Sequence, residues 1–392
     1  MKISRTNRVL TFGVVTAFAV ACGAKNDETE SEDTSTTPVN NGSTGTSSSN
    51  KIGSASNIAD LKLAGALAIN LPEAFQGAKA PGSSLALLAG KKSQEACMMG
   101  MTIAEEVRSV GEVGGFFCHI ELEKDRIKFG KKYRILFPNG NEFARIYVDN
   151  SQASAGKMTL GFCSTHRQDD GSTGRSRQLI LIDNLTDNGP KGSIVTEGSG
   201  TFESTAFSYG KSQQFDLSVA GVTSLIGKAM FSQTGNTYVR EVSLELKKTG
   251  LSSLKLANKG TSPAGDFFDR GVAFVSGDKG SAIFQTKGSF EGQAFEFANR
   301  AHFSNAGNVL GSSDVGAELQ PPMSALPAYL PSDFKPDAQT GWVGQDCPDY
   351  EEDVTLDPDS PSHKACDQDQ GKDYECHSQT EYERSTEQVT IE

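Results

Sequence analysis

The feature that most constrains the fold is the stretch from about residue 127 to 305, where short apolar runs alternate with turn-forming residues. Turn signals such as Pro138-Asn139-Gly140 and Gly277-Asp278-Lys279-Gly280 separate the runs, and no helical pattern lies between them. Parallel strands need a long crossover connection, usually a helix, so this spacing predicts antiparallel meanders of about a dozen strands. The predicted strands are Tyr133–Phe137, Phe143–Val148, Lys157–Cys163, Gln178–Ile182, Phe202–Tyr209, Gln214–Val219, Tyr238–Leu246, Leu251–Leu256, Val272–Val275, Ser281–Thr286 and Ala294–Phe303.

The predicted fold class is therefore mainly β, of the α+β type. Two architectures fit the pattern. One is a large twisted antiparallel sheet, or incomplete barrel, packed on one long helix near residues 93–122, and the other is a two-sheet sandwich. Glycine supplies 41 of the 392 residues, which suits strong twist, bulges and tight turns.

An amphipathic helix is predicted over residues 93–122, with Ser93 as its N-cap. Glu105, Glu106 and Arg108 fall opposite the apolar stripe. Each glycine in a helix interior costs up to about 1 kcal/mol relative to Ala, so we expect a kink or break in the middle. The stripe consists of Ala96, Ile103, Val107, Val110, Gly114 and Phe117, and the glycines are Gly111, Gly114 and Gly115.

Residues 61–71 alternate between larger apolar side chains and small or polar ones, which predicts a strand with one buried face. Pro72 would end that strand. The many alanines make a helix the competing interpretation.

The N-terminus has the organisation of a secretory signal peptide over residues 1–21. A basic Met1–Arg8 precedes the apolar run Val9–Ala21, whose 13 residues are too few to span a bilayer, which takes about 20. The run ends in Ala19-Val20-Ala21-Cys22. The same small residues also satisfy ordinary signal cleavage, which would release a soluble protein.

Placed directly after those small residues, Cys22 makes this segment resemble the signal of bacterial lipoproteins, although Ala19 replaces the usual Leu. The resemblance covers residues 1–22 only. It implies that Cys22 is the site of lipid attachment and that the protein is anchored in the cell envelope. Because Gly23 rather than Asp follows Cys22, the resemblance also implies the outer membrane if the cell is Gram-negative.

Composition divides the rest of the chain. Residues 22–57 have almost no apolar side chains beyond Cys22 and predict a disordered tether. The β domain with its helix is expected over 58–319, and five prolines predict an extended segment over 320–345 that runs along the body or links it to the tail. The net charge of −12 lies in an acidic tail, 346–392, so the remainder is neutral. The excess of acidic over basic residues argues against a nucleic-acid partner, which clustered Lys and Arg would bind.

Besides Cys22, six cysteines remain, and an even number in an exported chain predicts disulfides. Three lie in the body and three in the tail, so complete pairing requires at least one bridge between the two. Within the body we expect Cys163 to pair with Cys118 or Cys97. The candidates are Cys97, Cys118, Cys163, Cys347, Cys366 and Cys376.

Two metal hypotheses compete with simpler interpretations. Cys118-His119 and Cys163-Ser164-Thr165-His166 offer zinc-type ligands, against which we favour disulfides. Alternating acids over Asp367–Glu375 suggest weak calcium binding, but they match an EF-hand loop poorly and favour a solvated acidic strip. His302, between Ala301 and Phe303 in an alternating strand, is predicted to face solvent. No metal site and no cofactor are predicted.

The familiar catalytic motifs, among them G-x-S-x-G, H-E-x-x-H and the phosphate-binding loops, do not occur. The sequence therefore predicts a non-enzymatic envelope lipoprotein with a binding or structural role, whose partners are the membrane, through Cys22, and a protein or envelope component. A carrier of a hydrophobic ligand is the alternative, with a cavity between sheet and helix lined by Phe and Gly. An envelope-polymer hydrolase, which would need two facing carboxylates in a cleft, is the third class.

Overall fold

The structure is a computed structural model of the chain. It describes residues 52–55, 57–67, 69, 92–167, 173–202, 205–304, 308–336, 347, 349–357, 360–367, 382–383 and 387–391. The predicted signal peptide, the predicted lipid-attachment residue Cys22 and most of the predicted tether lie outside these residues.

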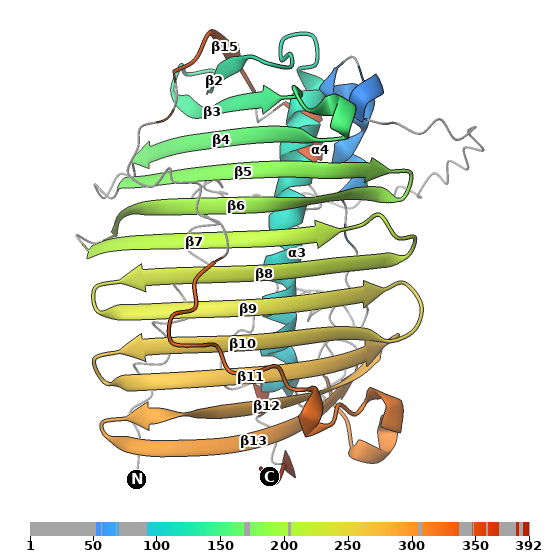
Figure 1. The fold of residues 1–392 in the computed structure, drawn as a ribbon, viewed down its shortest axis with the longest axis vertical. Helices are drawn as coiled ribbons and strands as arrows, with labels where there is room; N and C mark the ends of the chain where they lie inside the picture. The colour runs from blue at the N-terminus through green and yellow to red at the C-terminus, as the bar shows by residue number, and fades with distance from the viewer. Residues whose placement is uncertain are drawn as a thin grey trace, which may run out of the picture. The chain divides into compact units, whose positions relative to one another are not determined.

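Twelve consecutive strands form an antiparallel meander in which each strand pairs with the next along the chain. They belong to one open sheet, not to a sandwich, which confirms the mainly β class and the strand number expected from the spacing of turn residues (Figure 1). The strands are β2 (Lys132–Leu136), β3 (Glu142–Asp149), β4 (Met158–Arg167), β5 (Thr173–Thr186), β6 (Gly189–Phe202), β7 (Thr205–Asp216), β8 (Val222–Gln233), β9 (Asn236–Lys247), β10 (Ser252–Ser262), β11 (Gly265–Ser276), β12 (Lys279–Phe290) and β13 (Gln293–Ser304).

Short strands complete the sheet at both edges. At one edge β15 (Glu352–Thr355), from the acidic tail, pairs in parallel with β2. At the other edge β13 pairs with β14 (Asn308–Val309) and with β17 (Glu387–Gln388), also from the tail. There β1 (Lys92–Ser93) pairs with β14 and with β16 (Tyr382–Glu383). The predicted tail is thus part of the same sheet as the body.

One helix crosses the strands on one face of the sheet, α3 (Gln94–Leu122) (Figure 1). Its 29 residues span about 43 Å, enough to cross about nine strands at a spacing of about 4.8 Å. Ser93 caps the helix by accepting a hydrogen bond from the Ala96 amide, as predicted. The kink or break expected at the glycines does not occur. Buried side chains on both sides of them, Val110 and Phe117, hold the helix on the sheet and outweigh the low helix propensity of glycine.

Short helices, not a strand, occupy residues 58–61 and 63–66, so the strand predicted over 61–71 is wrong where the structure describes it. A capping box between Asn57 and Asp60 opens η4 (Ile58–Leu61), and α2 (Leu63–Ala66) follows. Leu61, Leu63 and Leu67 are buried in the main core. Leu63 and Leu67 are four residues apart, a spacing that suits one helical face as well as one strand face, so alternation alone could not decide. The described residues contain five further 3-10 helices, of which η3 lies before α3, η7 lies between β3 and β4, and the last three follow the sheet: η3 (Ile52–Ser54), η7 (Ala153–Ala155), η9 (Ser312–Asp314), η10 (Ala317–Leu319) and η11 (Met323–Ala325).

The start of the body lies inside the segment predicted as a tether. Ile52 is 2% exposed and belongs to the main core together with Ile58. Two isolated isoleucines in a polar stretch gave no periodicity, so their burial could not be read from the sequence.

Two strands, β6 and β8, were not predicted, and the expected strand Phe202–Tyr209 includes both the last residue of β6 and the first residues of β7. In β6 glycine explains why the strand was missed, because Gly192 and Gly198 interrupt its apolar pattern. In the paired register, glycines face aromatic side chains of the next strand, and a Cβ on the glycine would come within 3 Å of the ring. These pairs are Gly192–Phe215, Gly198–Tyr209, Gly260–Phe267, Gly271–Phe284, Gly280–Phe303 and Gly288–Phe295. Aromatic residues that cover glycines on a neighbouring strand are a recognised way to stabilise twisted sheets.

The proline-containing segment covers part of the sheet face opposite α3 (Figure 1). Leu330 packs with Val239 of β9 and Ala257 of β10, and Leu326 packs with Val272 of β11 and Ile283 of β12. The described residues 320–336 therefore run along the surface of the body.

Candidate functional site

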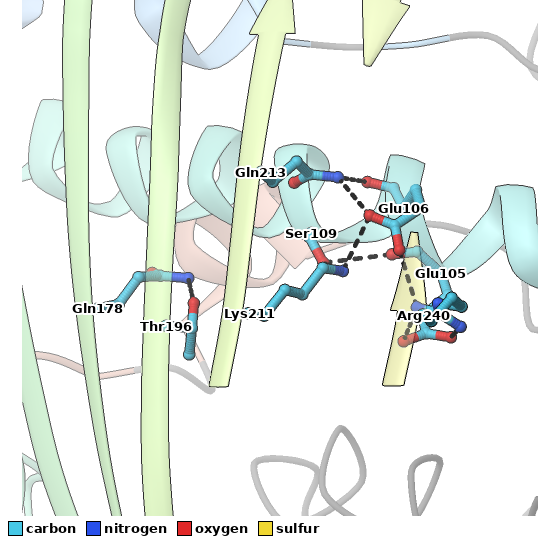
Figure 2. Close-up of polar contacts among 8 residues, drawn as sticks. All are labelled: Glu105, Glu106, Ser109, Gln178, Thr196, Lys211, Gln213 and Arg240. Atoms are coloured by element: carbon cyan, nitrogen blue, oxygen red, sulfur yellow. Dashed lines mark hydrogen bonds and ion pairs between the residues drawn. The ribbon is translucent and has the colours of Figure 1, made fainter. Parts of the chain in front are cut away.

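The most unusual polar site of the described chain is a buried charge cluster between the middle of α3 and the centre of the sheet (Figure 2). The Glu106 side chain is 1% exposed. Arg240 of β9, 8% exposed, donates from Nη2 to Glu106 Oε1 over 2.8 Å. Lys211 of β7 lies with its Nζ 3.2 Å from Glu106 Oε2. Two cations from different strands thus compensate one buried carboxylate.

Glu105 joins the cluster through the same arginine. Arg240 donates from Nη1 and Nη2 to the two Glu105 oxygens over 2.7 and 2.8 Å, a bidentate pair. Burial by itself would raise the pKa of the Glu105 carboxyl, but the charge and hydrogen bonds of Arg240, helped by Lys211 and Arg108, lower it to about 2. Part of the Glu105 side chain, 35%, still reaches solvent, so its surroundings are less dry than those of Glu106.

Neutral groups add further hydrogen bonds to the cluster. Gln213 of β7 donates to both the Glu106 backbone oxygen and its Oε2, each over 2.8 Å, and Lys211 also donates to Ser109 over 2.7 Å (Figure 2). Gly227 of β8 makes room for the carboxylate, since a Cβ there would lie 2.3 Å from Glu106 Oε2. The cluster therefore needs contributions from three neighbouring strands.

The sequence predicts that Glu105 and Glu106 lie opposite the apolar stripe of the helix. For Glu106 this prediction is wrong, because its side chain is buried between the helix and the sheet. The sheet is wide enough to cover that side of α3 too, and the partner residues Lys211 and Arg240 lie more than a hundred positions away. The available signal was a cation in the middle of each of two strands, Lys211 of β7 and Arg240 of β9, and this signal gains meaning only once the strands are placed beside the helix.

The chemistry of this cluster is structural. A glycosidase-type general acid needs a carboxyl group with a raised pKa, whereas the pKa of Glu105 is lowered and both carboxylates are bound by cations. The negative charges of Glu105 and Glu106 balance the positive charges of Lys211 and Arg240. These ion pairs fix the position of α3 on the sheet.

Acid should weaken this docking. The folded-state pKa of Glu105 is about 2, against an ordinary 4.5, so its ionised form stabilises the fold fully above about pH 4.5, and this contribution is lost as the pH falls toward 2. We expect thermal unfolding midpoints of the unchanged chain and of Glu105→Gln to differ most above pH 4.5 and to converge toward pH 2. Glu245→Gln, which removes an exposed ion pair with Lys247, is the control and should show little difference at any pH. Parallel curves for Glu105→Gln would contradict this role.

Two disulfides join the acidic tail to the body. Cys163 of β4 pairs with Cys347, and Cys118 of α3 pairs with Cys366 of α4 (Pro361–Asp367). The pairing expected within the body, Cys163 with Cys118 or Cys97, is therefore wrong. Sequence spacing could not choose, because the partners lie 184 and 248 residues apart. The hypothesis that Cys118 and Cys163 bind zinc is also wrong, since both are bonded to tail cysteines.

The two disulfides lie on opposite faces of the sheet. Leu160 of β4 belongs to the core under α3, and Cys163 lies an odd number of residues further along a regularly paired strand, so it points to the other face. Cys118 lies on α3 itself. The tail thus passes from one face to the other around the β2 edge, where β15 adds to the sheet.

Histidines lie at two of the contacts between the body and the tail. His119 and His363 stack at the α3–α4 contact with their Nδ1 atoms 2.7 Å apart. His302, predicted to face solvent, is instead 3% exposed, and its Nε2 lies 3.3 Å from Glu387 Oε2. Burial lowers the pKa of His302, while the Glu387 carboxylate acts in the opposite direction. The local sequence could not reveal the burial of His302, because β17, which supplies Glu387 and pairs with β13, comes from the far end of the chain.

Several predicted site residues lie outside the described residues or have undescribed side chains. Cys22, Cys376 and most of the calcium candidate Asp367–Glu375 are in the first group, and the side chains of Cys97 and His166 are in the second. Among the residues that the structure describes, no group of three or more His, Cys, Asp or Glu could hold a metal ion. Nor does any helix in these residues have the length and apolar character needed to cross a membrane.

A shallow hollow of about 100 Å³ lies between β6, β7 and β8, lined in part by Val195, Gln214 and Ile226. Ligand pockets usually measure about 300–1,000 Å³, so it is too small for a lipid. The space expected between sheet and helix holds side chains of the main core and the charge cluster, and six of the described glycines pair with aromatic residues across strands.

Comparisons with known proteins assign this chain to no family. No protein-family model matches it, and neither the curated proteins nor the solved structures contain a significant match.

Proposed function

We propose that this chain is a cell-envelope lipoprotein with a non-enzymatic binding or structural role, held at the membrane by a lipid on Cys22. The observation that carries the proposal is the pair of disulfides between body and tail. Such bonds persist in oxidising compartments outside the cytoplasm, where a signal peptide over residues 1–21 would deliver the chain.

The architecture favours a supporting or binding body over an enzyme or a carrier. The buried carboxylates are neutralised by Arg240 and Lys211, and the apolar side chains under α3 fill that space themselves. What the body offers to a partner is a broad, rigid sheet cross-linked to its own tail.

The anchor is tested by Cys22→Ser. We expect this variant to lose labelling by a radioactive or clickable palmitate and to leave the membrane fraction, because the thiol that would carry the lipid is gone. Ser31→Ala, in the predicted tether, is the matched control and should keep both the label and the membrane association. Persistent membrane association of Cys22→Ser, with no labelling of the unchanged chain, would overturn the proposal.

A further inference from the structure

The β2 edge of the sheet is a basic strip that is occupied by an acidic strand. Arg134 binds Asp353 through two hydrogen bonds, of 2.9 and 2.7 Å, and Lys131 pairs with Glu352. Arg126 donates to the Thr355 backbone oxygen over 3.1 Å. The tail segment 349–357 thus meets several cations of the body along a single edge.

Backbone and apolar contacts make this a strand-addition site as well as a charge match. The amides of Glu351 and Leu356 donate to the backbone oxygens of Lys132 and Leu136, each over 2.9 Å, on either side of the four-residue parallel ladder. Val354 is 2% exposed and enters the main core. Main-chain pairing with alternate side chains in pockets is how extended peptides bind sheet edges.

The cation cluster extends beyond the ladder to the residues just before it. The guanidinium carbon of Arg134 lies 4.3 Å from the centre of the Tyr350 ring, and that of Arg145 lies 5.1 Å from it. Arg145 also donates to the Cys347 backbone oxygen over 3.2 Å. The edge therefore recognises an extended segment that carries an aromatic residue followed by acids.

Little besides these contacts and the two disulfides fixes β15 to its own body. The ladder is short and parallel, and its ion pairs are partly exposed, with Arg134 at 29% and Asp353 at 43%. Disulfides at Cys347 and Cys366 bracket the segment and keep it at a high effective concentration near the edge. An identical segment from a second copy fits the same edge equally well until those bonds form.

We propose that the β2 edge is a binding site for an acidic extended strand, filled here by residues 349–357 of the same chain, and that a second copy supplies the same segment when chains fold together. The disulfides then decide whether the strand is held within one chain or between two. This inference does not depend on lipid attachment at Cys22, so its failure and that of the anchor are separate results.

Charge reversal on the two sides of the edge tests the proposal. In Arg134→Glu the edge repels its own Asp353, and in Asp353→Arg the tail repels its own Arg134, whereas each chain matches the other in trans. Full-length chains of both variants, one of them isotope-labelled, are reduced, mixed and refolded with glutathione disulfide as the oxidant. We expect disulfide-linked heterodimers, with Cys163 of one chain bonded to Cys347 of the other, at about ten times the level of either homodimer. Mass spectrometry without reduction identifies the linked peptides.

The matched control is the double variant Arg134→Glu/Asp353→Arg, which restores opposite charges within one chain; we expect it, like the unchanged chain, to refold as a monomer at low concentration. Because both side chains are partly exposed, these substitutions leave the core intact. Only intrachain disulfides in the mixture, at the level seen for each variant alone, would overturn the proposal. So would disulfide-linked dimers of the double variant at the same level, since their formation would not depend on charge at this edge.

Discussion

Replacing Arg240 with Met is expected to lower the free energy of unfolding by about 3–5 kcal/mol, because it leaves the Glu106 carboxylate, 1% exposed, without its best partner. Lys211 remains, but its Nζ lies further from the carboxylate, at 3.2 Å. Methionine keeps most of the side-chain volume, so the loss reports the charge and not a cavity. Urea denaturation followed by circular dichroism measures it.

An exposed ion pair supplies the control for this prediction. Lys247→Met removes the partner of Glu245, where both side chains are more than a third exposed, and should change stability by less than about 1 kcal/mol. Adding Glu106→Gln to Arg240→Met should recover part of the loss, with a coupling of about 0.5–3 kcal/mol, because the most deeply buried carboxylate of the cluster then carries no charge. Equal small effects at Arg240 and Lys247 would show that the cluster is more hydrated than its burial indicates.

Removing either disulfide is expected to be the second large effect. Cys163→Ser/Cys347→Ser and Cys118→Ser/Cys366→Ser open loops of 184 and 248 residues, and the loss of a native disulfide typically costs about 2–5 kcal/mol. The chain-entropy view places these long loops at the upper end of that range. Thermal unfolding of each double variant beside the unchanged chain measures the change.

The two bonds can be separated by where the chain becomes accessible. Loss of the Cys163–Cys347 bond frees the start of the tail, so limited proteolysis should first cut near residues 349–357. Loss of the Cys118–Cys366 bond frees α4, so cuts should come first near 360–367. Identical first cuts in the two variants, or stability changes below about 1 kcal/mol, would contradict the view that each bond fastens its own part of the tail.

The sequence by itself determined the class of the fold. Turn residues between short apolar runs identified most strands of the meander, the seven-, four- and three-residue steps identified α3, and Ser93 marked its start. These signals are local, since turn chemistry, capping and the period of the apolar residues act over a few positions. The sequence did not predict β6 and β8, because glycine or weakly apolar residues interrupt their apolar pattern. In β6, Gly192 and Gly198 leave room for the rings of Phe215 and Tyr209 on the next strand.

Only the tertiary structure decided what the charged and sulfur-containing residues do. Glu106 meets Arg240, Cys163 meets Cys347, His302 meets Glu387 and Arg134 meets Asp353, each across a wide gap in sequence. Nothing in a local pattern fixes such pairs, because burial and charge compensation depend on which strand lies beside which element. The tail that carries the net charge of −12 illustrates this. In the sequence it is an acidic appendage, but in the structure it supplies strands to both edges of the sheet and neutralises the basic strip at one of them.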